Sequence, residues 1–226
     1  MLGTIVNTGT ILAGSMIGSI FKKGIKEEYQ GALFTAMGLA ATGLGINSIV
    51  QNMPKSSYPV LFIISLALGS LLGTMLDLNG RFQRLSSRFS SSRLGEGLST
   101  GILLYCIGTL SILGPVQSAL YGDNTYLFTN ATLDFVTSMV LAATYGVGMA
   151  LAAGMLFAWQ GSIYLCAMLL GNFMTSDMMT EISITGGFLI ASSGISILGI
   201  KDCKTLNMLP SLLIPVLWFA VTGFFQ

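Results

Sequence analysis

Long apolar stretches, almost free of charge, follow one another along the whole chain, with short polar segments between them. A helix needs about 20 mainly apolar residues to cross a bilayer. The composition points the same way, because 53% of the 226 residues are hydrophobic and only 8% are charged, whereas soluble proteins carry about 25% charged residues. We therefore predict an all-α polytopic membrane protein. The eight predicted transmembrane helices are residues 2–21, 31–50, 59–79, 98–119, 133–157, 161–175, 183–200 and 207–225.

The fifth and sixth predicted helices belong to one apolar run that is interrupted only at residues 158–161, Ala-Trp-Gln-Gly. The run is too long for a single span, so a tight turn or a re-entrant hairpin is expected there. We treat residues 1–226 as one transmembrane domain. Its repeat-like units are expected at about residues 2–50, 59–119 and 133–200, followed by a final helix at 207–225.

The positive charges predict the orientation of the chain. Nine of the ten Lys and Arg residues follow the first, third and seventh predicted helices, and only Lys55 lies elsewhere. The positive-inside rule then places both termini outside, together with the loop at 121–130, which has no Lys or Arg. Between residues 80 and 96, arginines and apolar residues recur at helical spacing. This pattern predicts a short helix in the cytoplasmic interface, with a flexible loop as the alternative.

One apolar segment occurs twice. Residues 96–114 and 181–199 align without a gap and share eight of nineteen residues. A weaker copy lies at 27–45, and residues 11–21 resemble residues 66–76. The copy at 181–199 runs in the opposite direction in the predicted topology, and inverted repeats are typical of secondary transporters. The alternative is that helices rich in small residues resemble one another by composition alone.

Small residues four positions apart line one face of several predicted helices. Such faces allow two helix backbones to approach closely, so we expect helices to pack there. The residues are Gly14 and Gly18, Gly69 and Gly73, and Gly146, Ala150 and Gly154.

The nine acidic residues all lie at the ends of predicted helices or in loops. The candidates for a gating or charged role are Asp77, Asp134 and Glu181. Solvated charges at helix ends are the simpler interpretation, because an acid in the first turn of a helix is favoured by about 0.3–1 kcal/mol.

Uncharged polar side chains inside the predicted spans are the main candidates for binding a substrate or an ion. Such groups need partners in lipid, and hydroxyl, amide and backbone oxygens are ligands for alkali cations and small polar solutes. The alternative is that Ser and Thr bond to carbonyl groups of their own helix. The candidates are Asn7, Thr8, Thr10, Thr42, Asn47, Ser111, Asn172 and Ser196.

The sequence carries no enzyme signature. It has no His, which is the commonest general base and metal ligand, and it has neither a P-loop nor a dinucleotide-binding motif. Cys106, Cys166 and Cys203 form an odd set, so we expect neither disulfides nor a Cys metal site. We predict a protein that is not an enzyme, with no catalytic residue, metal or cofactor.

The first 25 residues, MLGTIVNTGTILAGSMIGSIFKKGI, resemble the start of the YdfK/YqgA-like family of bacterial inner-membrane proteins, which is known as a domain of unknown function. The likeness rests on Gly3, Thr4, Asn7, Gly14, Gly18, Lys22, Lys23 and Gly24. The resemblance covers essentially the whole chain in length and hydropathy. It implies a bacterial inner-membrane location and a transporter, such as a sodium channel or pump, and it transfers no binding residues.

These observations favour a secondary transporter for a small solute or a monovalent cation such as sodium, with a site of hydroxyl, amide and backbone oxygens near the midplane. A scaffold or sensor that moves nothing and a passive ion channel are the alternatives. The expected partners are the lipid bilayer, a small solute or cation, and further copies of the chain in a homo-oligomer. Nucleic acid is not expected, because a net charge of +1 offers no basic face.

Overall fold

The computed structural model is helical, and it describes residues 1–20, 26–87, 98, 101–102, 104–106, 109–171 and 175–224. Strands are absent from these residues, so the predicted all-α class is confirmed. By length and composition, five helices within the described ranges could cross a membrane. They are Glu27–Lys55, Thr125–Tyr145, Val147–Leu169, Ser176–Ile197 and Thr205–Thr222. Leu61–Met75 is a shorter apolar helix, and the number of eight spans stays a prediction.

The chain forms two compact units. The first comprises residues 1–34 and 82–171, and the second comprises residues 35–81 and 172–226. Helices of the first unit are α1 (Leu2–Ile20), α6 (Thr109–Tyr121), α7 (Thr125–Tyr145), the 3-10 helix η2 (Val147–Leu151) and α8 (Ala152–Leu170). The second unit holds most of α2 (Glu27–Asn52), then η1 (Met53–Lys55), α3 (Leu61–Met75), the start of α4 (Leu78–Ser87), α9 (Ser176–Ile197), α10 (Thr205–Met208), η4 (Leu209–Leu212) and α11 (Leu213–Phe224).

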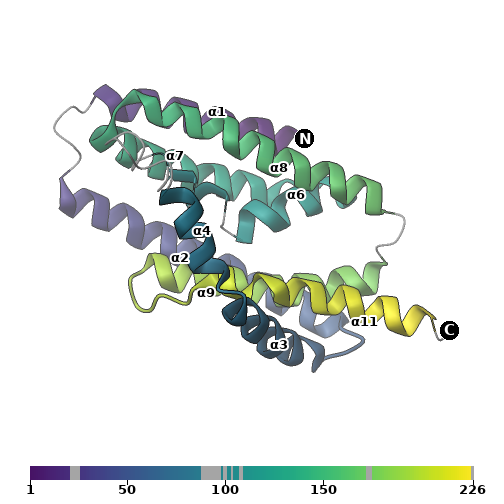
Figure 1. Ribbon diagram of the computed structural model, residues 1–226. Coiled ribbons are helices and arrows are strands. Elements are labelled where there is room, and N and C mark those ends of the chain that lie inside the picture. Colours follow the sequence, from purple (N-terminus) through teal and green to yellow (C-terminus); the bar gives the residue numbers. More distant parts are fainter. Residues whose placement is uncertain are drawn as a thin grey trace. The chain divides into compact units, whose positions relative to one another are not determined.

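In the first unit α1 lies along α7, and the two helices run in the same direction (Figure 1). Gly3 at the start of α1 lies against Leu127, and Gly14 further along lies against Phe135. A Cβ atom on Gly14 or Gly18 would collide with backbone carbonyl oxygens of α7. The prediction that these two glycines form a packing face is therefore confirmed.

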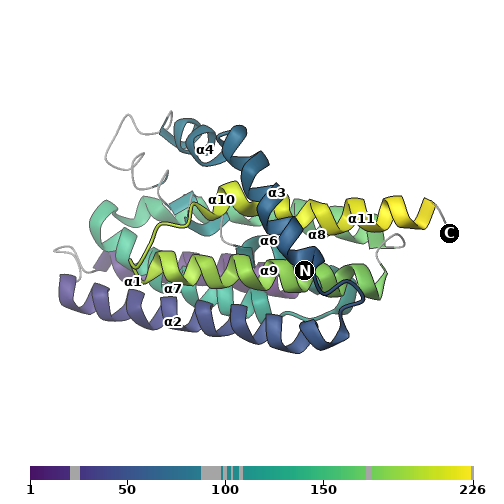
Figure 2. The same cartoon turned by 90° about the horizontal axis from the view of Figure 1, so that it is seen from below.

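In the second unit α2 and α9 lie side by side and run in opposite directions (Figure 2). Gly38 lies against Leu198, whereas Gly45, two turns later, lies against Ala191. The Ser48 hydroxyl, near the end of α2, donates to the Ser183 carbonyl at 3.0 Å. Small residues on both helices thus allow a close antiparallel contact.

The final helical segment of the second unit is broken into α10, η4 and α11, and α3 packs antiparallel to its first part. Gly69 lies against Ser211 and Gly73 against Asn207, which confirms the second predicted glycine face. Pro210 lies in the first turn of η4, and without an N–H it cannot continue the hydrogen bonding of α10. The third predicted face is wrong, because the chain turns at Gly146 and the space around both Gly146 and Gly154 is open.

The predicted break within the long apolar run is misplaced. Residues 158–161 lie inside α8, and the chain instead turns at Gly146, between α7 and η2. Gly146 has a φ of 92°, a conformation that residues with a Cβ atom rarely adopt. The predicted outer loop at 121–130 is also too long, since α7 already begins at Thr125.

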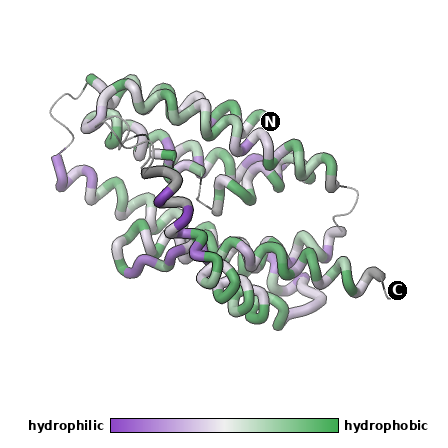
Figure 3. The backbone as a smooth tube through the Cα atoms, in the orientation of Figure 1, coloured by the Kyte–Doolittle hydropathy of each residue, from purple (hydrophilic) through white to green (hydrophobic). Residues whose placement is uncertain are grey.

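Polar residues gather at the start of α2 and in α4, whereas most other helices are largely hydrophobic (Figure 3). The helix predicted within residues 80–96 is confirmed up to Ser87, because α4 covers Leu78–Ser87, and its location in the membrane interface stays a prediction. Residues 88–96 of that prediction lie outside the described residues.

Candidate functional site

Asp134 lies in the middle of α7, whereas the sequence predicted it at the end of a helix that begins at residue 133. Asp134 is the tenth of the 21 residues of α7, which places it about 14 Å along the axis at 1.5 Å per residue. In a helix that spans a hydrocarbon core about 30 Å thick, this is close to the midplane. The expectation that Asp134 is a solvated end charge is wrong, because its side chain is only 4% exposed.

The Asp134 carboxylate faces amide groups from two helices. Asn130, one turn earlier on α7, donates its Nδ2 to Asp134 Oδ2 at 2.9 Å. Asn7 of α1 lies close enough to interact with the same carboxylate, but its Nδ2 makes no well-formed hydrogen bond among the described residues. Asn7 is fully buried. The structure thus brings together two predicted candidates, Asn7 and Asp134, and adds Asn130.

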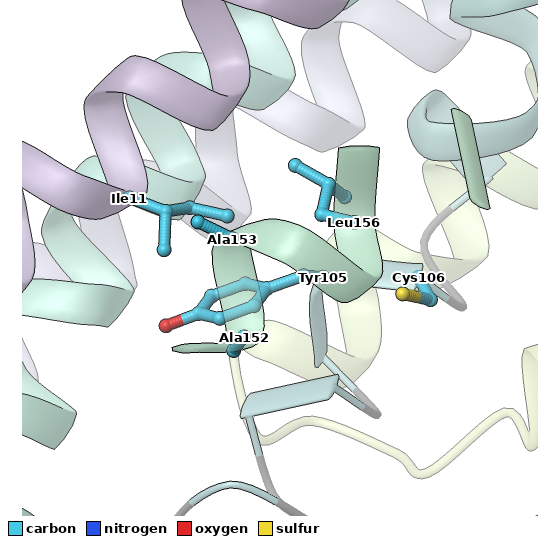
Figure 4. Close-up of a cluster of buried hydrophobic side chains, with 6 residues drawn as sticks. All are labelled: Ile11, Tyr105, Cys106, Ala152, Ala153 and Leu156. Atoms are coloured by element: carbon cyan, nitrogen blue, oxygen red, sulfur yellow. The ribbon is translucent and has the colours of Figure 1, made fainter. Parts of the chain in front are cut away.

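A phenol and a thiol complete the surroundings of Asp134. Tyr105 and Cys106 both lie near enough to interact electrostatically with the carboxylate. The Tyr105 hydroxyl lies next to Ser138, although it is without a hydrogen-bond partner of good geometry in the described part of the chain. In Figure 4 the Tyr105 ring lies between Ile11 of α1 and Ala152 of α8.

The described helices α1, α6, α7, η2 and α8 offer Asp134 no cationic partner. Every Lys and Arg of the chain lies outside α1, α6, α7, η2 and α8. The known neighbours of the carboxylate are neutral amide, hydroxyl and thiol groups. A carboxylate buried in this way is costly when charged, and acids inside membranes usually mark ion or proton pathways.

A second polar contact in the first unit joins α6 and α8. Gln160 donates its Nε2 to the Ser111 Oγ at 2.9 Å, and both side chains are fully buried. The Gln160 Oε1 atom has no partner within the residues that the structure describes. Ser111 was a predicted candidate, whereas Gln160 was assigned to a turn and missed. Its position in the middle of an uninterrupted apolar helix would have been the signal.

Other predicted candidates in α1 and α2 have local partners. Thr8 donates to the Thr4 carbonyl at 2.8 Å, and Thr10 donates to the Asn7 carbonyl at 2.7 Å. Thr42 likewise bonds to the Gly38 carbonyl of its own helix at 2.8 Å. The structure therefore favours the structural alternative for these three hydroxyls.

The remaining uncharged candidates are scattered. Asn47 is exposed and accepts a hydrogen bond from Gln51 at 3.2 Å. The Ser196 hydroxyl accepts from the Cys203 N–H at 3.1 Å and thereby fastens the turn after α9. Asn172 lies outside the described residues.

The two other acidic candidates differ from each other. Asp77 accepts a hydrogen bond from the Gly80 N–H at 3.2 Å at the start of α4, which is a capping position. Glu181 lies in the second turn of α9 and is only 1% exposed. Like Asp134, it is a buried acid and not a solvated end charge.

The helical architecture, the five apolar helices of sufficient length and the buried polar groups define an integral membrane protein of the all-α class. The chain belongs to the family described as Protein of unknown function (DUF554), whose model matches residues 2–220. This confirms the family resemblance seen in the first 25 residues.

Two relatives span nearly the whole chain. It is 60% identical over 225 residues to the "Uncharacterized membrane protein YdfK" of Bacillus subtilis (strain 168), covering 99% of this chain and 98% of the relative. It is 27% identical over 240 residues to the "Uncharacterized protein YqgA" of Escherichia coli (strain K12), covering 97% of this chain and all of the relative. No solved structure matches the chain.

Proposed function

We propose that this membrane protein is a secondary transporter that moves a monovalent cation, or a small solute together with one, and that Asp134 carries the charge. The observation behind the proposal is a carboxylate in the middle of α7, buried among neutral polar groups and helices without Lys or Arg. Such a group needs a bound cation or a proton to offset its charge.

The surroundings of Asp134 favour a ligand with a single positive charge. One carboxylate balances one charge, and the nearby phenol, hydroxyl and amide groups add neutral oxygen atoms. Hard oxygen ligands of this kind suit alkali cations. The unpartnered Tyr105 hydroxyl oxygen leaves room for a further bond to a cation, and the unpartnered Asn7 Nδ2 can donate to an oxygen of a bound solute.

Helix directions support alternating spans. Within the units, α1 is parallel to α7, α2 is antiparallel to α9, and α3 is antiparallel to the start of the last segment. Eight alternating helices with external termini would have these same directions. The side of each terminus comes from the Lys and Arg distribution, by which we propose an inner-membrane protein with both termini outside, and we expect a homo-oligomer.

Flux through proteoliposomes tests the proposal. Purified protein should move at least one member of a panel of alkali ions, amino acids and organic acids, and Asp134→Asn should abolish the flux while the protein still folds. The matched control is Asp123→Asn, which changes an exposed acid before α7. If no member of the panel moves, or if both variants retain full flux, the proposal fails, and a stoichiometric partner found instead would favour a scaffold.

Asn7→Ala separates binding from packing in the same assay. Ala is a strong helix former, so the variant should fold while flux falls, because an amide beside Asp134 is lost. Gly14→Leu, seven residues later on α1, should instead prevent the close contact with α7 and reduce the amount of folded protein. Loss of folding in both variants would make Asn7 a structural bridge.

A further inference from the structure

We propose that the second unit contains its own binding site for an alkali-metal ion, formed by the Glu181 carboxylate and the Thr185 hydroxyl of α9. The chain would then bind two monovalent cations, one in each unit. This site does not depend on whether the protein transports anything.

Only one of the two carboxylate oxygens of Glu181 has hydrogen-bond partners. Its Oε1 accepts from the Ser56 hydroxyl at 2.5 Å and from the Tyr58 N–H at 3.1 Å. Its Oε2 is buried and has no partner among the described residues. A buried carboxylate oxygen without a donor is costly, and a cation would supply the missing partner.

Thr185 provides a second, independent oxygen one turn further along α9. Its side chain is 0% exposed, and its Oγ1 bonds to no described atom. A Thr hydroxyl within a helix can bond to a carbonyl of its own helix, as the half-buried Thr180 does with the Ser176 carbonyl at 3.0 Å. Residues four apart share a helix face, so Thr185 and Glu181 present their free oxygens on the same face of α9.

The free oxygens of Glu181 and Thr185 can both act as ligands of a metal ion. The two atoms are not hydrogen-bonded to each other. A cation accepts lone pairs from both oxygens without direct contact between them. The nearby Asp177 is exposed, which leaves a single buried carboxylate and favours a monovalent ion.

Aromatic contacts hold one of the residues that bind Glu181 in place. Tyr58, whose N–H binds Glu181, packs its ring edge-to-face on Trp218 and Phe219 of α11, with centroid distances of 5.5 and 5.6 Å. These aromatic contacts hold the turn before α3 against Glu181.

The two units repeat the same pair of residue types. In α7 the buried Asp134 is followed four residues later by the buried Ser138, and in α9 Glu181 is followed four residues later by Thr185. Each pair places an acid and a hydroxyl on one helix face.

Salt-dependent thermal unfolding of the purified protein in nanodiscs tests the second site. LiCl, NaCl or KCl replaces choline chloride at constant ionic strength, so that screening stays the same. A bound ion raises the unfolding midpoint with its concentration. Asp134→Asn removes the first site, and at least one alkali ion should still raise the midpoint of this variant.

Further substitutions in the Asp134→Asn protein show which residues cause the remaining rise of the unfolding midpoint with alkali ions. Glu181→Gln should abolish it, and Thr185→Val should weaken the apparent affinity about tenfold, as expected for the loss of one buried oxygen partner. Thr180→Val is the matched control and should change nothing, because its hydroxyl bonds to its own helix.

Three results would overturn the second site: no alkali response in Asp134→Asn, an unchanged response after Glu181→Gln, or a response to lower pH in place of alkali ions. If Glu181→Gln does not fold, the comparison of Thr185→Val with Thr180→Val decides. This test uses no flux measurement. The second-site proposal can therefore fail while the transporter proposal stands, and the transporter proposal can fail while the second site stands.

Discussion

Gly18→Ala tests how closely α1 and α7 pack. A Cβ atom at Gly18 would collide with the Met139 carbonyl oxygen and would lie 2.8 Å from Met139 Cα, where ordinary contact begins at 3.4 Å, so α1 would have to move more than about 0.6 Å away from α7. The obstacle is backbone, so no side-chain rotation can relieve it. Overpacking of this kind costs about 1–3 kcal/mol, while Ala in place of Gly in a helix returns about 0.8–1.0 kcal/mol. We expect Gly18→Ala to be about 0–2 kcal/mol less stable than the wild type.

Gly9→Ala is the control on the same helix. Gly9 is exposed, and a Cβ atom there would meet nothing within 4 Å. The gain in helix propensity is the same in both variants, so their difference isolates the overpacking, about 1–3 kcal/mol. Unfolding by SDS titration in mixed micelles measures this difference. Equal free energies of unfolding for the two variants would refute the close contact between α1 and α7.

Three further predictions follow from the polar groups and the topology. Asn130→Ala removes the donor to a buried carboxylate and should lower the free energy of unfolding by about 1–3 kcal/mol, measured by the same SDS titration. Gln160→Leu removes a buried amide with one unpartnered oxygen and should leave stability within about 1 kcal/mol of the wild type while lowering proteoliposome flux. In a protein without native cysteines, Cys at position 123 should react with an impermeant thiol reagent on intact cells, and Cys at 201 should not; the reverse would invert the topology.

The glycine faces could be predicted from the sequence because their spacing carries the information. Glycines four residues apart must lie on one side of a helix, and two of the three predicted faces contact another helix, at Gly14 and at Gly69. The partner helix could not be predicted in this way. Which helix packs against α1 depends on contacts between residues far apart in the sequence, and a single sequence does not contain them.

The break in the long apolar run could not be located from the sequence. Gly146 and Gly161 both lie in this run, and hydropathy does not distinguish them. Only the backbone does, since Gly146 has a positive φ and Gly161 is helical. Because the break was predicted at the wrong position, Asp134 was assigned to a helix end and Gln160 to a turn. Neither residue was therefore recognised as a buried polar group in the middle of a helix.

The structure separates the polar candidates by the kind of bond that each side chain can make. Ser and Thr can reach a carbonyl of their own helix, and Thr8 and Thr42 do so, so a hydroxyl in an apolar helix carries little information about a site. A carboxylate or an amide in the middle of a helix needs partners that the helix backbone does not supply. Asp134 and Gln160 accordingly lie buried against other side chains, and the Gln160 Oε1 atom has bonding capacity left over. In a membrane helix without His, Lys or Arg, such residues are therefore the first place to look for the ion or solute.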